Sequence, residues 1–179
     1  MSQASKIGRQ PALRKRSKGM ELKTSSGRTA KAKASVFSLA AATAENLGGV
    51  GGIGFRVVSD ADMAKAVERG FSIKAIDALR KRGMTDKEIG ALIIKPRTLS
   101  HRREKRQKLT AEESDRAARV ARVKALTRKT FGNEDKANRW LHKSLNSLEG
   151  RRPIDLVNTA VGARVVEDIL TRIAWGASA

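Results

Sequence analysis

Three groups of residues in this chain have the types and spacing that could support chemistry. Gly49, Gly51 and Gly54 fit the G-x-G-x-x-G pattern, whose backbone amides bind a dinucleotide pyrophosphate. His101 and His142 are the two histidines of the chain. The third group is residues 96–106, where arginine, lysine, serine and threonine offer hydrogen-bond donors to nucleic acid. The chemistries to weigh are therefore dinucleotide binding, acid–base catalysis and nucleic-acid binding.

The glycine pattern has the wrong order for a dinucleotide site. Such a site needs a strand before the glycines and a helix that begins at the last of them. Here residues 38–47 are rich in alanine and typical of a helix, whereas residues 55–58 resemble a strand. We therefore interpret residues 36–58 as an Ala/Gly-rich connector and predict no cofactor. A nucleotide-binding enzyme that uses Gly51 and Gly52 remains the enzymatic alternative.

The histidines and the missing cysteines argue against catalysis. His101 lies in a cationic segment, and His142 has no obvious carboxylate or serine beside it that would make it an acid or base. The absence of cysteine excludes thiolate zinc sites, iron–sulfur clusters, cysteine nucleophiles and a disulfide-stapled fold. We therefore predict no catalytic residues and no metal in a protein of the reducing cytoplasm.

Positive charge is concentrated in two parts of the chain. The 38 lysines and arginines outnumber the 18 acidic residues, which gives a net charge of +20. Residues 1–35 carry ten basic and one acidic residue, residues 71–109 carry twelve and four, and residues 110–179 carry thirteen and nine. An acidic partner is expected, and no apolar run reaches the roughly 18 residues of a membrane span.

The first basic part, residues 1–35, is rich in Ser, Thr, Gly and Lys and has no sustained apolar period. A chain of this composition cannot bury enough apolar surface to offset its conformational entropy. We predict a disordered basic tail. It is either an arm that binds phosphates without sequence preference or a solvated tail without a specific role.

Helix start and stop signals recur from Ser59 onward and predict an all-α fold. Ser59, Ser72, Asn133 and Pro153 have the types that begin helices, and capping boxes begin at Thr85 and Thr110. The predicted helices are 60–69, one that Ser72 caps and Gly83 ends, 86–92, 97–108, 111–131, one after Asn133, one from Pro153, and 161–175.

Residues 85–108 are typical of a helix-turn-helix, with the turn at 93–95 and Ile89, Leu92 and Leu99 directed inward. A glycine is usual where Ile93 stands. The second helix would read DNA, and its alternative is a solvated basic surface. The candidates for base edges are Arg97, Thr98, Ser100 and His101, and those for phosphates are Arg102, Arg103, Lys105 and Arg106.

The last predicted helix is apolar over more than one face. Val165, Ile169 and Ile173 form one row, and Val166 and Leu170 lie beside it. A helix this apolar completes a core or meets a partner, and we expect both, with self-association first. Trp140 is expected in the core. Trp175 precedes only small residues and is the better candidate for a contact.

The order and spacing of motifs over residues 60–179 resemble the Xre/MbcA/ParS antitoxins. The shared motifs are residues 97–99 with 102–103, residues 109–116, Phe131-Gly132, Ala137 with Trp140-Leu141, residues 153–156, and residues 166–170 with Arg172, Ile173 and Gly176. The resemblance implies an Xre-like helix-turn-helix domain at 59–109 and a small helical toxin-binding domain at 110–179.

The resemblance also implies a function: a type II antitoxin, which is itself not an enzyme. It would be a cytoplasmic, all-helical homodimer that neutralises a RES-domain toxin, which consumes NAD or transfers its ADP-ribose, and that binds operator DNA to repress its own operon. Arg172, Trp175 and Gly176 would face the toxin by matching position and block its NAD pocket. The alternative is a helix-turn-helix repressor or nucleoid protein without a toxin partner.

Overall fold

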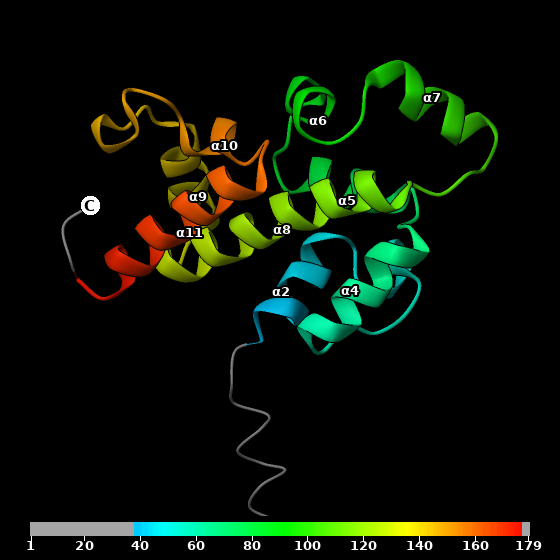
Figure 1. Cartoon of the computed structure of the whole chain (residues 1–179), viewed down its shortest axis with the longest axis horizontal. Coiled ribbons are helices and arrows are strands. Elements are labelled where there is room, and N and C mark those ends of the chain that lie inside the picture. The colour runs from blue at the N-terminus through cyan, green and yellow to red at the C-terminus, as the bar shows by residue number, and fades with distance from the viewer. Residues whose placement is uncertain (1–37, 177–179) are drawn as a thin grey trace, which may run out of the picture. The chain divides into compact units, whose positions relative to one another are not determined.

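A computed structural model describes residues 38–176 of the chain, and these residues form helices without any strand (Figure 1). The all-α prediction is confirmed for this part, while the predicted tail at 1–35 lies outside it. The helices are α2 (Leu39–Asn46), α3 (Val50–Ile53), α4 (Asp60–Arg69), α5 (Lys74–Lys81), α6 (Asp86–Leu92), α7 (Pro96–Glu104), α8 (Ala111–Phe131), α9 (Glu134–His142), η1 (Asn146–Leu148), α10 (Pro153–Leu156) and α11 (Ala160–Ala174).

Side-chain caps begin α4, α6, α8 and α9 at the residues that the sequence predicts. Ser59, Thr85 and Thr110 form capping boxes with the carboxylates three residues later, so each box satisfies two backbone N–H groups at the start of α4, α6 and α8. Gly132 ends α8 in the left-handed conformation. Ser72 is the exception: α5 begins only at Lys74, whose amide donates to the Ser72 hydroxyl at 3.3 Å.

The long helix α8 is the element on which the others pack. It contacts α2, α4, α5, α6, α9 and α11. Its buried residues include Ala117, Val120, Ala121 and Val123, whose small side chains let neighbouring helices come close. One hydrophobic cluster extends from Ala40 in α2 to Leu170 in α11. The predicted helix-turn-helix region and the predicted C-terminal region therefore share one core.

The structure corrects the interpretation of residues 38–58 as a connector. Leu47 is fully buried, and Ala40 and Ala44 join the same hydrophobic cluster. The buried Asn46 side chain donates from Nδ2 to the Ala121 carbonyl oxygen of α8 at 2.9 Å. Residues 55–58 form no strand and lead, as irregular chain, into α4. An alanine-rich helix was visible in the sequence, but its burial depends on α8.

The surroundings of Gly52 show why a glycine is needed at this position. A Cβ atom at this position would overlap the Leu47 carbonyl oxygen and would lie 3.2 Å from the Cα atom of Ala75 in α5. The Gly52 carbonyl also accepts a hydrogen bond from the Ser72 amide at 2.8 Å. The glycine therefore permits close packing of α3 on α5, and the strand-then-helix order of a dinucleotide site is absent here.

No helix within residues 38–176 combines the length and the apolar composition that crossing a bilayer requires. The apolar residues of the described helices instead pack on one another, with Phe71, Ile76 and Leu79 fully buried between α4, α5 and their neighbours. The core is thus built from short amphipathic helices around α8.

A pair of glycine substitutions tests the α3–α5 contact. Gly52→Ala should lower the free energy of unfolding by about 2 kcal/mol or more, because the backbone must move to admit the Cβ atom. Gly51→Ala is the matched control, since a Cβ atom there meets nothing within 4 Å, and it should change stability by less than about 1 kcal/mol. Urea unfolding followed by circular dichroism measures both; equal effects would contradict the close-packing explanation.

Candidate functional site

Helices α6 and α7 form the predicted helix-turn-helix. Ile89 and Leu92 of α6 and Leu99 of α7 are buried, as predicted. Ile93 occupies the turn with φ −123° and is 1% exposed, so no left-handed residue is needed there. The amides of Ile93 and Ile94 both donate to the Ile89 carbonyl oxygen at 3.0 Å. The turn therefore closes by burying two isoleucines rather than by using a glycine.

A chain of ion pairs fixes α7 to the two helices before it. The Arg103 guanidinium lies 2.6 Å from a carboxylate oxygen of Asp77 in α5. The same Asp77 carboxylate contacts Arg80 at 3.0 Å, and Arg80 contacts Asp86 at the start of α6 at 2.7 Å. Arg103 was predicted to contact phosphates, but its side chain is only half exposed and already has this partner. We assign it to positioning α7.

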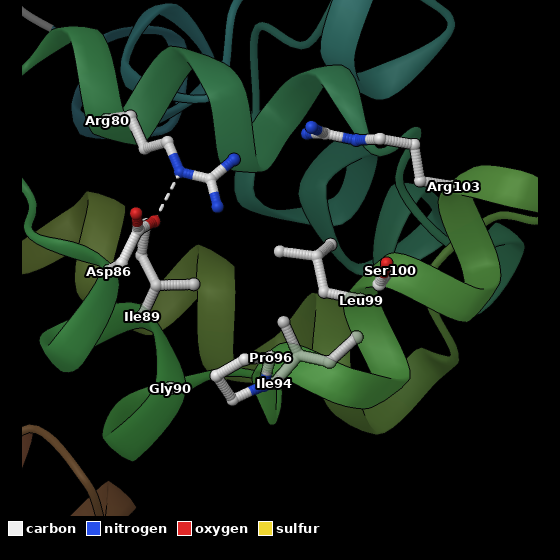
Figure 2. Close-up of a pocket in the computed structure, with 9 residues that line it drawn as sticks. All are labelled: Arg80, Asp86, Ile89, Gly90, Ile94, Pro96, Leu99, Ser100 and Arg103. Carbon is white, nitrogen blue, oxygen red and sulfur yellow. Dashed lines mark hydrogen bonds and ion pairs between the residues drawn. The ribbon is translucent and has the colours of Figure 1, made fainter.

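A cleft of about 290 Å³ lies between α5, α6 and α7 (Figure 2). In Figure 2, Arg80 and Asp86 stand on one side, and Ser100 and Arg103 of α7 stand on the other. The lining residues are Arg80, Asp86, Ile89, Gly90, Ile94, Pro96, Leu99, Ser100 and Arg103. The one hydroxyl of this lining, on Ser100, stands across the cleft from its one carboxylate, Asp86, which is paired with Arg80. Within residues 38–176 no cluster of His, Cys, Asp and Glu suits a metal ion.

Arg102 was predicted to contact phosphates, and the structure gives it another partner. Its side chain is 19% exposed, and its Nε atom lies 3.0 Å from Glu113 in the capping box of α8. Its two Nη atoms donate to Glu113 at 3.2 Å and to the Lys108 carbonyl oxygen at 3.3 Å. Arg102 therefore joins the end of α7 to the start of α8.

The reading helix is shorter than predicted, because it ends at Glu104 instead of residue 108. Arg106 adopts φ +53°, a left-handed conformation, and the Gln107 amide donates to the Arg102 carbonyl oxygen at 2.9 Å. The chain must reverse here because Leu109 is buried and its amide donates to the Phe71 carbonyl oxygen at 2.9 Å. Tertiary contact thus overrides the helical pattern at 105–108.

The remaining DNA-binding candidates are all exposed, and their side chains have no hydrogen bond or ion pair with another residue of the described part. They are Arg97, Thr98, Ser100, His101, Lys105 and Arg106. Pro96 is the first residue of α7, and no side chain caps this helix. The positive end of the helix dipole therefore lies beside the exposed Arg97, whereas the exposed Lys105 and Arg106 follow the other end of α7.

The exposed face of α11 is the second candidate surface. Val166, Ile169 and Leu170 are buried, whereas Val165, which the sequence places in one apolar row with Ile169, is 39% exposed. Arg172, Trp175 and Gly176 lie at the exposed end of the helix, where the Trp175 side chain is 85% exposed, and Gly176 has φ +77°. Trp140, by contrast, packs against the core, and the centroid of its ring lies 5.6 Å from the centroid of the Phe131 ring.

Polar contacts hold the C-terminal helices on α8. Lys124 is 5% exposed, and its ammonium donates to the Asn138 side-chain oxygen of α9 at 2.8 Å. Burial lowers the pKa of Lys124, against the opposing effect of Glu134. Arg122 contacts Glu167 of α11 at 3.1 Å and Asp60 of α4 at 3.4 Å. Cationic residues of α8 therefore join helices from both halves of the chain.

His142 links α9 to the helix-turn-helix, which the sequence does not show. Its Nε2 atom lies 2.6 Å from Glu88 of α6, and its Nδ1 atom lies 2.6 Å from the Asn138 carbonyl oxygen. Glu88 also accepts a hydrogen bond from the Thr85 amide at 2.9 Å. Burial raises the pKa of Glu88, but the contacts with Thr85 and His142 outweigh burial, so the net pKa lies below its usual value.

Comparison with known proteins matches the segments that contain α7 and α11 to two family domains. Residues 62–122 match the family described as "Antitoxin Xre-like helix-turn-helix domain", and residues 127–176 match "Antitoxin Xre/MbcA/ParS C-terminal toxin-binding domain". An "Antitoxin Xre" of Pseudomonas putida is 35% identical over 120 residues, which cover 67% of this chain and 76% of that protein. An "Antitoxin Xre" of Yersinia enterocolitica is 32% identical over 117 residues, covering 64% and 79%. The chain belongs to the Xre antitoxin family.

This membership confirms the predicted antitoxin of a toxin–antitoxin system and gives each surface a partner class. The reading helix α7 lies within the matched helix-turn-helix, which indicates DNA binding, and α11 lies within the matched toxin-binding domain. The antitoxin is a regulatory toxin-binding protein and not an enzyme. The glycine segment at 49–54 therefore has the structural role that Gly52 shows, which removes the reason for the enzymatic alternative.

The Glu88 contacts predict an acid-sensitive link between α6 and α9. Because the pKa of Glu88 is lowered in the fold, its carboxylate contributes stability above the usual glutamate pKa of about 4.3 and loses that contribution as the pH falls through the lowered value. Glu88→Gln should lower the free energy of unfolding by about 1–2 kcal/mol at neutral pH, and the difference from the wild type should shrink below about pH 4.

Urea unfolding of the wild type and the variant across this pH range measures the effect. Glu104→Gln is the control, since Glu104 is exposed in α7 and its side chain has no ion pair with another described residue. A Glu88 variant that matches the control at every pH would show that the link contributes nothing to stability.

Proposed function

We propose that this antitoxin neutralises a RES-domain toxin in the cytoplasm and binds operator DNA to repress its own operon. The observation that carries the proposal is one chain with two exposed surfaces of different chemistry: the free cationic side chains on and just after α7, and the exposed face of α11 that ends at Trp175. The toxin–antitoxin role comes from the family. The RES partner follows from the motif resemblance over residues 60–179.

For DNA, the candidates divide into two groups by position on α7. Arg97, Thr98, Ser100 and His101 lie in its first half and are proposed to contact base edges in the major groove. Lys105 and Arg106 follow its C-terminal end and are proposed to contact phosphates. We no longer place Arg102 and Arg103 on phosphates, because each already holds α7 through an acidic residue. Their part in DNA binding is the orientation of the reading helix.

Repression is proposed to need a homodimer. A single helix-turn-helix reads one half-site of a few base pairs, and two-fold pairing of proteins lets two reading helices enter successive major grooves about 34–36 Å apart. The proposal therefore includes an operator with two inverted half-sites. The homodimer that the family resemblance implies supplies the symmetry.

For the toxin, the proposed mechanism is obstruction of the NAD pocket by the end of α11. Trp175 is almost fully exposed, although tryptophan is the residue type that most often anchors protein interfaces. Arg172 lies one helical turn before it on the same side, and Gly176 allows the chain to leave the helix at that point through its positive φ. The toxin would be prevented from consuming NAD or transferring its ADP-ribose.

The DNA proposal predicts different effects for two cationic side chains. Affinity for the DNA upstream of the gene should fall steeply with salt. Arg97→Ala should cost about 1–3 kcal/mol on the preferred sequence and relax the preference at one base pair, because a base-edge contact is lost. Lys105→Ala should weaken all sequences alike and reduce the salt slope by about 1. Fluorescence anisotropy on operator and scrambled duplexes measures both, and identical behaviour would overturn the assignment of reading residues.

The toxin proposal predicts loss of protection when the end of the chain is removed. Cells that express the neighbouring RES-domain protein should grow with the full antitoxin and stop growing when residues 175–179 are deleted. The control is Arg97→Ala, which alters α7 and should still protect. A RES-domain protein that fails to co-purify with the full chain would show that the partner is wrong, whereas protection by the shortened chain would exclude obstruction by Trp175.

A further inference from the structure

Large apolar side chains are exposed at five positions of the described part of the chain: Val50, Val58, Val161, Val165 and Trp175. Single exposed apolar residues are common on protein surfaces and need no explanation. Three of these five, however, lie within the matched toxin-binding domain, and all three are on α11 or at its end. The apolar surface that this domain offers to a partner is therefore the outer side of one helix.

The three residues share one row of that helix. Val161, Val165, Asp168, Arg172 and Trp175 follow the spacing i, i+4, i+7, i+11 and i+14, which keeps side chains on one face. At 1.5 Å per residue, this outer row is about 21 Å long. Figure 1 shows α11 running along α8, on which its opposite face is buried. The outer row therefore faces away from α8.

The two valines do not belong to the hydrophobic core. Thr159 caps α11 by accepting a hydrogen bond from the Gly162 amide at 3.0 Å, and Val166, Ile169 and Leu170 attach the helix to the core. Val161 is 77% exposed and Val165 is 39% exposed. Exposed apolar residues that add nothing to the core are the type that the centre of an interface buries.

We propose that the toxin lies along the whole outer row of α11, with Val161 and Val165 providing affinity and the Trp175 end providing obstruction. This inference rests on the proposed function and deepens it. The occupant is the toxin because the row is continuous with Arg172 and Trp175 in the toxin-binding domain. The row is one side chain wide, so a second copy of the chain lying on it would cover the residues that the toxin needs.

The row also defines the toxin surface that it fits. That surface offers an apolar strip opposite the two valines, groups of both charge signs opposite Asp168 and Arg172, and a slot for the indole ring. Because affinity is assigned to the valines and obstruction to Trp175, substitutions should separate binding from inhibition. Replacement of the valines should weaken the complex, but a saturating concentration of the antitoxin should still inhibit the toxin. Removal of Trp175 should leave a complex in which the toxin keeps part of its activity.

The test uses the full-length antitoxin and the neighbouring RES-domain protein, each purified separately. Val161→Asp and Val165→Asp are combined, and Val50→Asp is the matched control, because Val50 is 58% exposed but lies in α3. Aspartate in the first turn of α11 favours the helix dipole, so the Val161 change should not unfold the helix. Circular dichroism and the melting temperature check that all variants fold.

Isothermal titration calorimetry should show the dissociation constant of the double variant raised by about 100-fold and that of the control unchanged. At saturating antitoxin, NAD turnover by the toxin should remain inhibited with the double variant and return in part with residues 175–179 deleted. Sedimentation should give the same antitoxin oligomer for all variants.

Each other outcome overturns the inference in a recognisable way. Wild-type affinity of the double variant would show that the valines are outside the interface, while the proposed function would stand. A changed oligomer with unchanged toxin affinity would assign the row to a second copy of the chain. No binding by the wild-type antitoxin would reject the RES partner itself, and the inference with it.

Discussion

The buried face of α8 is the constraint on which the rest of the described structure depends. Alanines and valines on this helix allow α2, α4, α9 and α11 to approach closely, and a single hydrophobic cluster results. Short helices of seven to ten residues are marginal alone, so their stability comes from this packing. The matched helix-turn-helix and the matched C-terminal toxin-binding domain therefore both pack against α8.

Charge serves two separate purposes in this protein. Arg102 and Arg103 come from the basic helix α7, yet both are paired with acidic residues that hold this helix in place. The neighbouring Arg97 and Lys105 have no such partner and remain available to nucleic acid. A net positive charge thus indicates an acidic partner in general, while the ion pairs decide which cations can reach it. Paired and unpaired cationic side chains thus lie close together along residues 97–105.

The two functional regions are also joined by polar contacts away from the hydrophobic core. His142 of the toxin-binding domain contacts Glu88 of the helix-turn-helix, and Arg122 of α8 contacts residues on both sides. Such contacts fix the relative orientation of packed helices more strictly than apolar packing does, because hydrogen bonds are directional. The reading helix and α11 therefore belong to a single framework, and an antitoxin of this size can present both surfaces without a separate linker between them.

The sequence by itself determined the local features of this antitoxin. Capping boxes at Thr85 and Thr110, the stop at Gly132, the buried Leu99 and the family motifs depend on residues close in the chain, so their patterns are readable without a structure. Only the tertiary structure decided that Arg102 meets Glu113, that Val165 is exposed while Ile169 is buried, and that residues 38–58 belong to the core. These outcomes depend on which distant helix faces each side chain. The periodicity of apolar residues along one helix does not determine this, because it is compatible with several arrangements of the helices.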